Sequence, residues 1–225
     1  MTRKQSSSQE RRRMQQAADR RAGRLRWVAI FGVALLIAVA LIARQEADQN
    51  GAVEAQAGLA PANTQGSPDA PVQIVEFADF GCTSCRAWHQ SGVKEQLLAE
   101  FGEQISFTFR HLPVITLQSP KAAEAAQCAA DQDAFWQYHD FLYENAGPGR
   151  LSVPELKQYA ATVGLDAAIF DDCLDGGRYE TYVQQDLQAA MDMGARGTPS
   201  FYVNGEPAFL FTYDSAAATI RRHLN

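Results

Sequence analysis

Residues 75–85 read VEFADFGCTSC, and this stretch decides the fold. It begins in the alternating, β-rich run VQIVEF at 72–77, which predicts a buried strand. It ends in Cys82-x-x-Cys85, where helix-forming sequence begins and continues to about residue 101. A cysteine at a helix start lies beside unpaired backbone N–H groups and the positive end of the helix dipole, which lower the pKa of its thiol. The spacing therefore predicts that Cys82 is a nucleophile and Cys85 a more protected resolving thiol.

The order of elements after this stretch predicts the architecture. Periodicity, capping and turn signals place a strand at 105–109, two helical segments within 119–145, helices starting at 153, 167 and 179, a strand at 200–203, a returning strand at 208–211 and a helix at 215–223. Strand, helix, strand, helical block, hairpin and helix is the order of a thioredoxin fold. We therefore predict an α/β fold of this type at 71–225, with a helical insertion at about 115–195.

The N-terminal segment combines strong positive charge with a long apolar run. Residues 1–26 hold nine Lys or Arg and two acids, a net charge of +7 in a chain whose total is −6. Residues 27–43 (WVAIFGVALLIAVALIA) contain no charge, and as a helix they would extend for roughly 25 Å. A hydrocarbon core is ~30 Å thick, so this length lies at the lower edge of the range for a membrane span. We predict a transmembrane signal anchor; a cleaved signal peptide is the alternative.

The charge bias also predicts the topology. Positive segments stay in the cytoplasm, so 1–26 is expected to be a cytoplasmic tail and the C-terminal part extracytoplasmic, which makes a single-pass protein of the cell membrane. This explanation replaces a nucleic-acid-binding role for the basic tail. Residues 44–70 are rich in Ala, Gln, Gly, Asn and Pro without apolar periodicity, so they are expected to form a flexible linker.

Export bears on the two remaining cysteines, Cys128 and Cys173, which both fall in the helical block. Disulfides form and persist outside the cytoplasm, so we predict a structural disulfide between them. Two free buried cysteines are the alternative. A four-cysteine zinc module is a further one, but a second Cys-x-x-Cys is missing, and no metal is expected.

Two further features support redox chemistry at Cys82. Thr198-Pro199 lies just before a predicted strand, where thioredoxin folds place a cis-proline loop that faces the redox sulfurs; an ordinary strand-start proline is the alternative. Glu76 is the only acid in the first strand, six residues before Cys82. If buried, it would carry protons and shift the thiol pKa; the alternative is an acid at a strand edge that reaches solvent.

At this point a family resemblance is clear. The stretches VEFADFGCTSC (75–85), FTFRHLPV (107–114), AAEAAQCAADQDAFWQYHDFLYEN (122–145) and ARGTPSFYVNG (195–205) resemble the DsbA-like thiol–disulfide oxidoreductases, especially the membrane-anchored bacterial type. The resemblance implies that Cys82 and Cys85 are catalytic, that Thr198-Pro199 is the cis-proline loop and that Glu76 is the family's buried acid. It also implies reoxidation by a membrane quinone-linked thiol oxidase, with no cofactor of the chain's own.

The dipeptide between the cysteines departs from the family. Oxidising members usually carry Pro, often with His, whereas this chain has Thr83-Ser84, whose hydroxyls could donate hydrogen bonds to a thiolate. We expect an enzyme that donates disulfides to exported proteins. The alternatives are a reductase or isomerase of the same fold, or a membrane-anchored binding or chaperone domain with structural cysteines. Of the histidines, His89 is expected on the helix surface and His139 in apolar packing.

Overall fold

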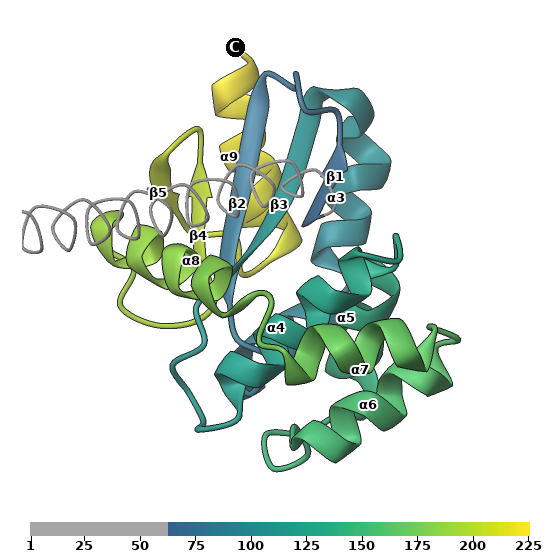
Figure 1. Ribbon diagram of the computed structural model, residues 1–225. Helices are drawn as coiled ribbons and strands as arrows, with labels where there is room; N and C mark the ends of the chain where they lie inside the picture. Colours follow the sequence, from purple (N-terminus) through teal and green to yellow (C-terminus); the bar gives the residue numbers. More distant parts are fainter. Residues whose placement is uncertain (1–62) are drawn as a thin grey trace, which may run out of the picture. The chain divides into compact units, whose positions relative to one another are not determined.

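The computed structural model describes residues 63–225 (Figure 1). The expected cytoplasmic tail, the expected transmembrane helix and most of the expected linker lie outside these residues. Within 63–225, no helix is both long and apolar enough to cross a membrane.

Five strands form one sheet in the order β1-β3-β2-β4-β5. The central pair, β2 and β3, is parallel, and the remaining pairs are antiparallel. The strands are β1 (Thr64–Gly66), β2 (Val72–Ala78), β3 (Ile105–His111), β4 (Ser200–Val203) and β5 (Glu206–Ala208). The predicted α/β thioredoxin architecture is confirmed in this part of the chain.

Two short edge strands differ from the sequence-based expectation. The linker was expected to run to residue 70, but Thr64–Gly66 pairs with β3, and the Thr64 and Thr108 hydroxyls are 2.8 Å apart. This polar tripeptide has no alternation that would have identified it. The returning strand was expected at 208–211, but β5 begins at Glu206, because the tight Asn204-Gly205 turn, with positive φ at both residues, pairs Val203 directly with Glu206.

Alternation along the central strand decides which side chains meet which helices. Val72 and Ile74 pack in one apolar cluster with residues of α3 (Val93–Phe101) and α9 (Tyr213–Leu224). Phe77 packs on the opposite face with Ala190 of α8 (Glu180–Asp192), which crosses in front of the sheet in Figure 1. Because side chains alternate between faces, Glu76 shares the face of Ile74.

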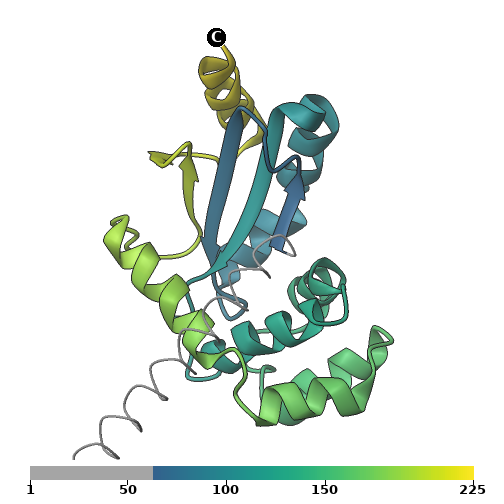
Figure 2. The same ribbon diagram turned by 45° about the horizontal axis from the view of Figure 1, so that its top comes forward.

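Four further helices gather at one end of the sheet (Figures 1 and 2). They are α4 (Ser119–Ala130), α5 (Phe135–Asn145), α6 (Val153–Thr162) and α7 (Ala167–Asp175). The Ser152–Glu155 capping box that was predicted at the start of α6 is present. The apolar core of this insertion also contains Phe80, Cys82, Cys85 and Phe109. The insertion therefore buries the end of the sheet from which the predicted redox pair projects.

A single helix was expected from Cys82 to about Phe101, but the structure has two. The helix α2 (Thr83–Gln90) ends before Gly92, whose φ of 68° lies in the left-handed region, and α3 starts at Val93. The turn redirects the chain, so that α2 faces the insertion through α5 while α3 packs on α9.

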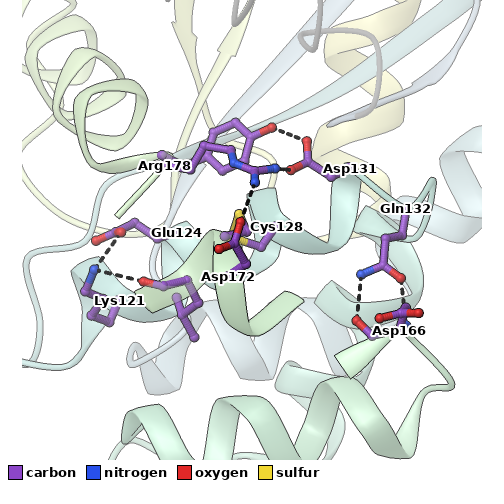
Figure 3. The surroundings of a disulfide bond; sticks show 11 residues. Lys121, Glu124, Cys128, Asp131, Gln132, Asp166, Asp172 and Arg178 are labelled. Carbon is purple, nitrogen blue, oxygen red and sulfur yellow. Dashed lines mark hydrogen bonds and ion pairs between the residues drawn. A yellow bond between two sulfur atoms is a disulfide. The ribbon is translucent and has the colours of Figure 1, made fainter. Parts of the chain in front are cut away.

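A disulfide joins Cys128 of α4 to Cys173 of α7, and both residues are fully buried. Figure 3 shows the polar groups that surround it. Arg178 bonds to Asp131 at 2.7 Å and to Asp172 at 3.3 Å, so it ties the ends of the two bridged helices together. The disulfide thus lies in the apolar core of the insertion, with these polar contacts beside it.

Removing this disulfide should destabilise the domain without altering its architecture. The bridge closes a loop with a sequence separation of 45, which in the chain-entropy model is worth about 4 kcal/mol. We expect a Cys128→Ala/Cys173→Ala variant to lose 2–4 kcal/mol, to order of magnitude, in guanidinium unfolding. As a control, reductant should cause a similar loss in a Cys82→Ser/Cys85→Ser background, where it acts on this bridge alone. A loss below about 0.5 kcal/mol in both tests would contradict the assignment.

Candidate active site

The turn between β2 and α2 is held by the side chain of Asp79. One carboxylate oxygen accepts a hydrogen bond from the N–H of Gly81 and the other from the N–H of Ile115, both at 2.7 Å. The backbone C=O of Asp79 accepts from the N–H of Cys82 at 3.0 Å. Gly81 is required here by space, because a Cβ would lie 2.9 Å from Oγ of Ser119. Sequence reasoning missed Asp79, although its position directly after a buried strand is a usable signal.

Cys82 occupies the N-cap position of α2. Its Sγ accepts a hydrogen bond from the backbone N–H of Cys85 at 3.5 Å and donates one to the C=O of Thr198 at 3.3 Å. Both cysteines are free thiols, Cys82 with 7% of its surface exposed and Cys85 with none. The more exposed sulfur is therefore the one at the helix N-terminus.

The surroundings of Cys82 lower the pKa of its thiol to about 5. The largest cause is a hydrogen bond from the Cys85 side chain; burial opposes it, and the neighbouring Thr198 lowers the pKa further. Backbone N–H groups of Cys85 and Ser84 contribute further. At pH 7 the sulfur is a thiolate, which is the form that takes part in exchange.

The hydroxyls of Thr83 and Ser84 do not act as expected. Both side chains are exposed, and within the described residues neither hydroxyl bonds to the Cys82 sulfur. Ser84 contributes through its backbone N–H instead. The dipeptide therefore acts through the backbone geometry of the first helical turn.

Burial raises the pKa of the Cys85 thiol, and the hydrogen bond to Cys82 and the charge of Glu76 raise it further. Cys85 thus stays protonated while Cys82 is ionised. This difference gives the two sulfurs different roles. Cys82 exchanges with the substrate, and Cys85 resolves the mixed disulfide.

Glu76 lies in the central strand between Phe109 of β3 and Phe201 of β4, with 3% of its surface exposed. The alternative of a strand-edge acid that reaches solvent is therefore wrong. Burial raises the pKa of its carboxyl to about 8, against the opposing charge of Lys94. Lys94 is itself buried, with its ammonium 4.3 Å from the centre of the Trp136 ring. Sequence reasoning missed this lysine, because a lysine in an amphipathic helix is usually exposed.

The Thr198–Pro199 peptide bond is cis, and Pro199 is buried just before β4. The structure thus brings together four of the expected residues: Cys82, Cys85, Thr198 and Pro199. The charge of Glu76 raises the pKa of Cys85, and the charge of Cys82 raises the pKa of Glu76. The Cys128–Cys173 disulfide lies apart from them, inside the insertion, which excludes a four-cysteine zinc module. Asp79 and Lys94 complete the site.

Comparison with known proteins agrees with this arrangement. A family model described as thioredoxin matches residues 60–221. The chain belongs to the thioredoxin family. Oxidised BdbD from Bacillus subtilis has a similar structure, with a TM-score of 0.65 and 26% identity over 72% of this chain and 92% of that chain. The probable disulfide bond formation protein D of Bacillus cereus is 28% identical over 197 residues, which cover 80% of this chain and 87% of that protein. The DsbA-like resemblance, and the thiol–disulfide oxidoreductase class that it implies, are confirmed.

Other relatives are longer proteins. The Na(+)/H(+) antiporter NhaA of Herminiimonas arsenicoxydans is 36% identical over 155 residues, which are 69% of this chain and 24% of the antiporter. The chain therefore spans about a quarter of the length of such relatives. Nothing about antiport is carried over from this match to the chain.

The thiol pKa gives a first test. In the reduced chain, one thiol should titrate near pH 5, as followed by thiolate absorbance or by the pH dependence of alkylation, and Cys82→Ser should abolish it. Since this pKa lies below the ordinary value of 9.0, the thiolate stabilises the reduced fold fully above pH 9, and the effect is lost as pH falls to about 5. Cys85→Ser should leave a titration that is shifted upward. A midpoint above 8 in the unaltered chain would contradict the assignment.

The buried carboxyl gives a second test, in the oxidised chain, where neither thiol titrates. Burial, the largest cause of the raised pKa of Glu76, is still present in the oxidised chain, although the charge of Cys82 is not. Because the folded pKa stays above the ordinary 4.5, the fold should lose stability as pH rises from about 4.5 through the raised pKa. A Glu76→Gln variant should lack this dependence and exceed the unaltered chain by at least about 1 kcal/mol at pH 8.5 in urea unfolding. The exposed Glu206→Gln serves as the control and should retain the dependence. Identical pH profiles for Glu76→Gln and the unaltered chain would rule out a buried acid of raised pKa.

Proposed function

We propose that this chain donates disulfides to the thiols of exported proteins through Cys82 and Cys85. The observation that carries the proposal is the lowered pKa of Cys82 at the start of α2. A stabilised thiolate favours the reduced pair, so the corresponding disulfide is a stronger oxidant. A pKa lowered from 9.0 to about 5 means that the reduced form carries a stable thiolate at pH 7, which raises the reduction potential of the pair.

The reaction begins with the Cys82–Cys85 disulfide. A substrate thiolate attacks the sulfur of Cys82, a bond forms between these two sulfurs, and the bond to Cys85 breaks. Cys82 is the attacked sulfur because it is the more exposed of the pair. The Cys85 sulfur leaves as a thiolate and takes up a proton, as its raised pKa favours.

Glu76 is the proposed source of that proton. Its carboxyl carries a proton at pH 7, because burial raises its pKa to about 8, and its charge is coupled to both sulfurs. Proton delivery from the buried acid, directly or through water, would move the negative charge from the Cys85 sulfur to the Glu76 carboxylate, which feels the opposing charge of Lys94.

A second substrate thiolate then completes the exchange. It attacks the substrate sulfur of the mixed disulfide, the substrate disulfide forms, and Cys82 leaves as a thiolate. The low pKa of Cys82 makes it a good leaving group, since exchange is faster when the departing thiol has a low pKa. Two electrons have then passed from the substrate to the enzyme.

The loop before α4 supplies a surface for the substrate. Val114, Ile115 and Leu117 are exposed apolar side chains, and Leu117 is fully exposed. The hydrogen bond from Ile115 to Asp79 ties this loop to the turn that precedes Cys82. An unfolded protein with exposed apolar residues is the kind of substrate that such a surface would hold.

Membrane attachment and reoxidation complete the proposal. Residues 27–43 would anchor the chain in the membrane, with 1–26 in the cytoplasm and the redox domain outside. A membrane quinone-linked thiol oxidase would then take the two electrons from the reduced pair. This arrangement is supported by the charge and apolar pattern of the sequence and by the DsbA-like resemblance.

The reduction potential tests the direction. Thioredoxin lies at about −270 mV and DsbA at about −120 mV. We expect this chain, equilibrated in glutathione buffers and read by thiol trapping, to lie above about −180 mV. A value below that would favour the reductase alternative, while the catalytic pair would stand. If a Cys82→Ser/Cys85→Ser variant kept the biological effect of the chain, the binding or chaperone alternative would replace both.

A further inference from the structure

Two histidines and an aspartate meet where α2 packs on α5. His139 Nδ1 lies 2.7 Å from Oδ1 of Asp140, and His89 Nε2 lies 3.8 Å from the same oxygen. One ligand atom from each residue falls within 4.8 Å of those of the other two. The two histidines are 50 positions apart in the sequence, so no local spacing pattern predicts that they meet. His89 was expected on the surface, but only 10% of its side chain is exposed.

The donor set suits one kind of ion. Two imidazole nitrogens and one carboxylate oxygen are ligands that Zn²⁺ accepts, with a fourth position for water or another carboxylate. Magnesium and calcium would require oxygen ligands. A hollow of about 380 Å³ opens beside the cluster and is lined by His89 and Asp140, together with Glu95 and Glu144. The carboxylates give the hollow negative charge, and the hollow itself gives solvent a route to His89 and Asp140.

The surroundings of His139 favour metal coordination. Its ring is buried among the aromatic rings of Phe80, Phe109, Phe135, Trp136 and Tyr143. Its Nε2 has no hydrogen-bond partner in the described part of the chain. When Nδ1 donates to Asp140, Nε2 is a buried lone pair without a donor, which costs free energy. A metal ion on Nδ1 would move the proton to Nε2, where the N–H can point at aromatic rings.

We propose that His89, His139 and Asp140 form a binding site for one Zn²⁺ ion. Each imidazole in its neutral form has a nitrogen lone pair with which it can bind the ion. The positive charge of Lys94 would repel a cation here. Three nearby carboxylates, those of Asp140, Glu95 and Glu144, would attract it. The ion would link α2, which carries the redox cysteines, to α5 of the insertion. It would thereby stabilise the contact that buries Cys85, one turn before His89.

The test uses the purified full-length chain in its disulfide form, so that Cys82 and Cys85 cannot bind metal. Equilibrium dialysis against Zn²⁺ alone, followed by metal analysis, should find one ion per chain. His89→Gln and Asp140→Asn should each weaken binding at least tenfold, with unchanged far-ultraviolet circular dichroism. His223→Gln, in α9 and outside the cluster, is the matched control and should bind as the unaltered chain does.

Cobalt substitution identifies the ligands. Co²⁺ in this site should give visible ligand-field bands without a thiolate charge-transfer band. Absence of zinc uptake, equal uptake by His89→Gln and the unaltered chain, or a thiolate band would each overturn the proposal. None of these outcomes bears on disulfide donation, because the measurement requires no turnover of the redox pair.

Discussion

The hydrogen bonds offered to the Cys82 sulfur at the start of α2 are the interaction on which the site depends. A sulfur at an N-cap replaces the oxygen that normally accepts from the first helical N–H groups. Because sulfur is larger and weaker as an acceptor than oxygen, the neutral thiol satisfies these donors poorly and the thiolate satisfies them well. The helix therefore favours the ionised form, even though the side chain is nearly buried. Every later step follows from which of the two sulfurs carries the charge.

Glu76 and Cys82 illustrate how burial and hydrogen bonding compete. Both are nearly buried acids, yet the pKa of Glu76 rises to about 8 and that of Cys82 falls to about 5. The difference lies in the donors. Cys82 receives hydrogen bonds from the Cys85 side chain and from backbone N–H groups. Glu76 is fully desolvated, and only the charge of Lys94 opposes the effect of that burial on its pKa to a comparable degree. At pH 7, Cys82 therefore carries the negative charge and Glu76 carries a proton, which is the arrangement that proton transfer during exchange requires.

The sequence predicted the parts of the molecule that local patterns determine. The central strand, the helical block, the Ser152–Glu155 capping box and the Cys-x-x-Cys helix start follow from alternation, period and turn chemistry, and the structure contains each of them. It did not predict β1, because Thr64–Gly66 forms a strand only through pairing with β3. The roles of Asp79 and Lys94 were missed for a related reason. Their burial depends on contacts with Ile115 and Trp136, which are distant in sequence and met only in the fold.

The chain holds two cysteine pairs, and burial separates their roles more clearly than sequence spacing does. Cys128 and Cys173 have no exposed surface and lie in the apolar core of the insertion, so a substrate thiolate cannot reach either sulfur. The ion pairs of Arg178 lie beside them (Figure 3). Cys82 keeps 7% of its surface exposed beside an apolar loop. Exchange needs in-line access to the attacked sulfur, so of the two pairs only this one can exchange electrons with a protein substrate. The buried disulfide supports that chemistry indirectly. It stabilises the insertion whose apolar core encloses Cys85, and that enclosure is the main reason why the pKa of Cys85 is raised.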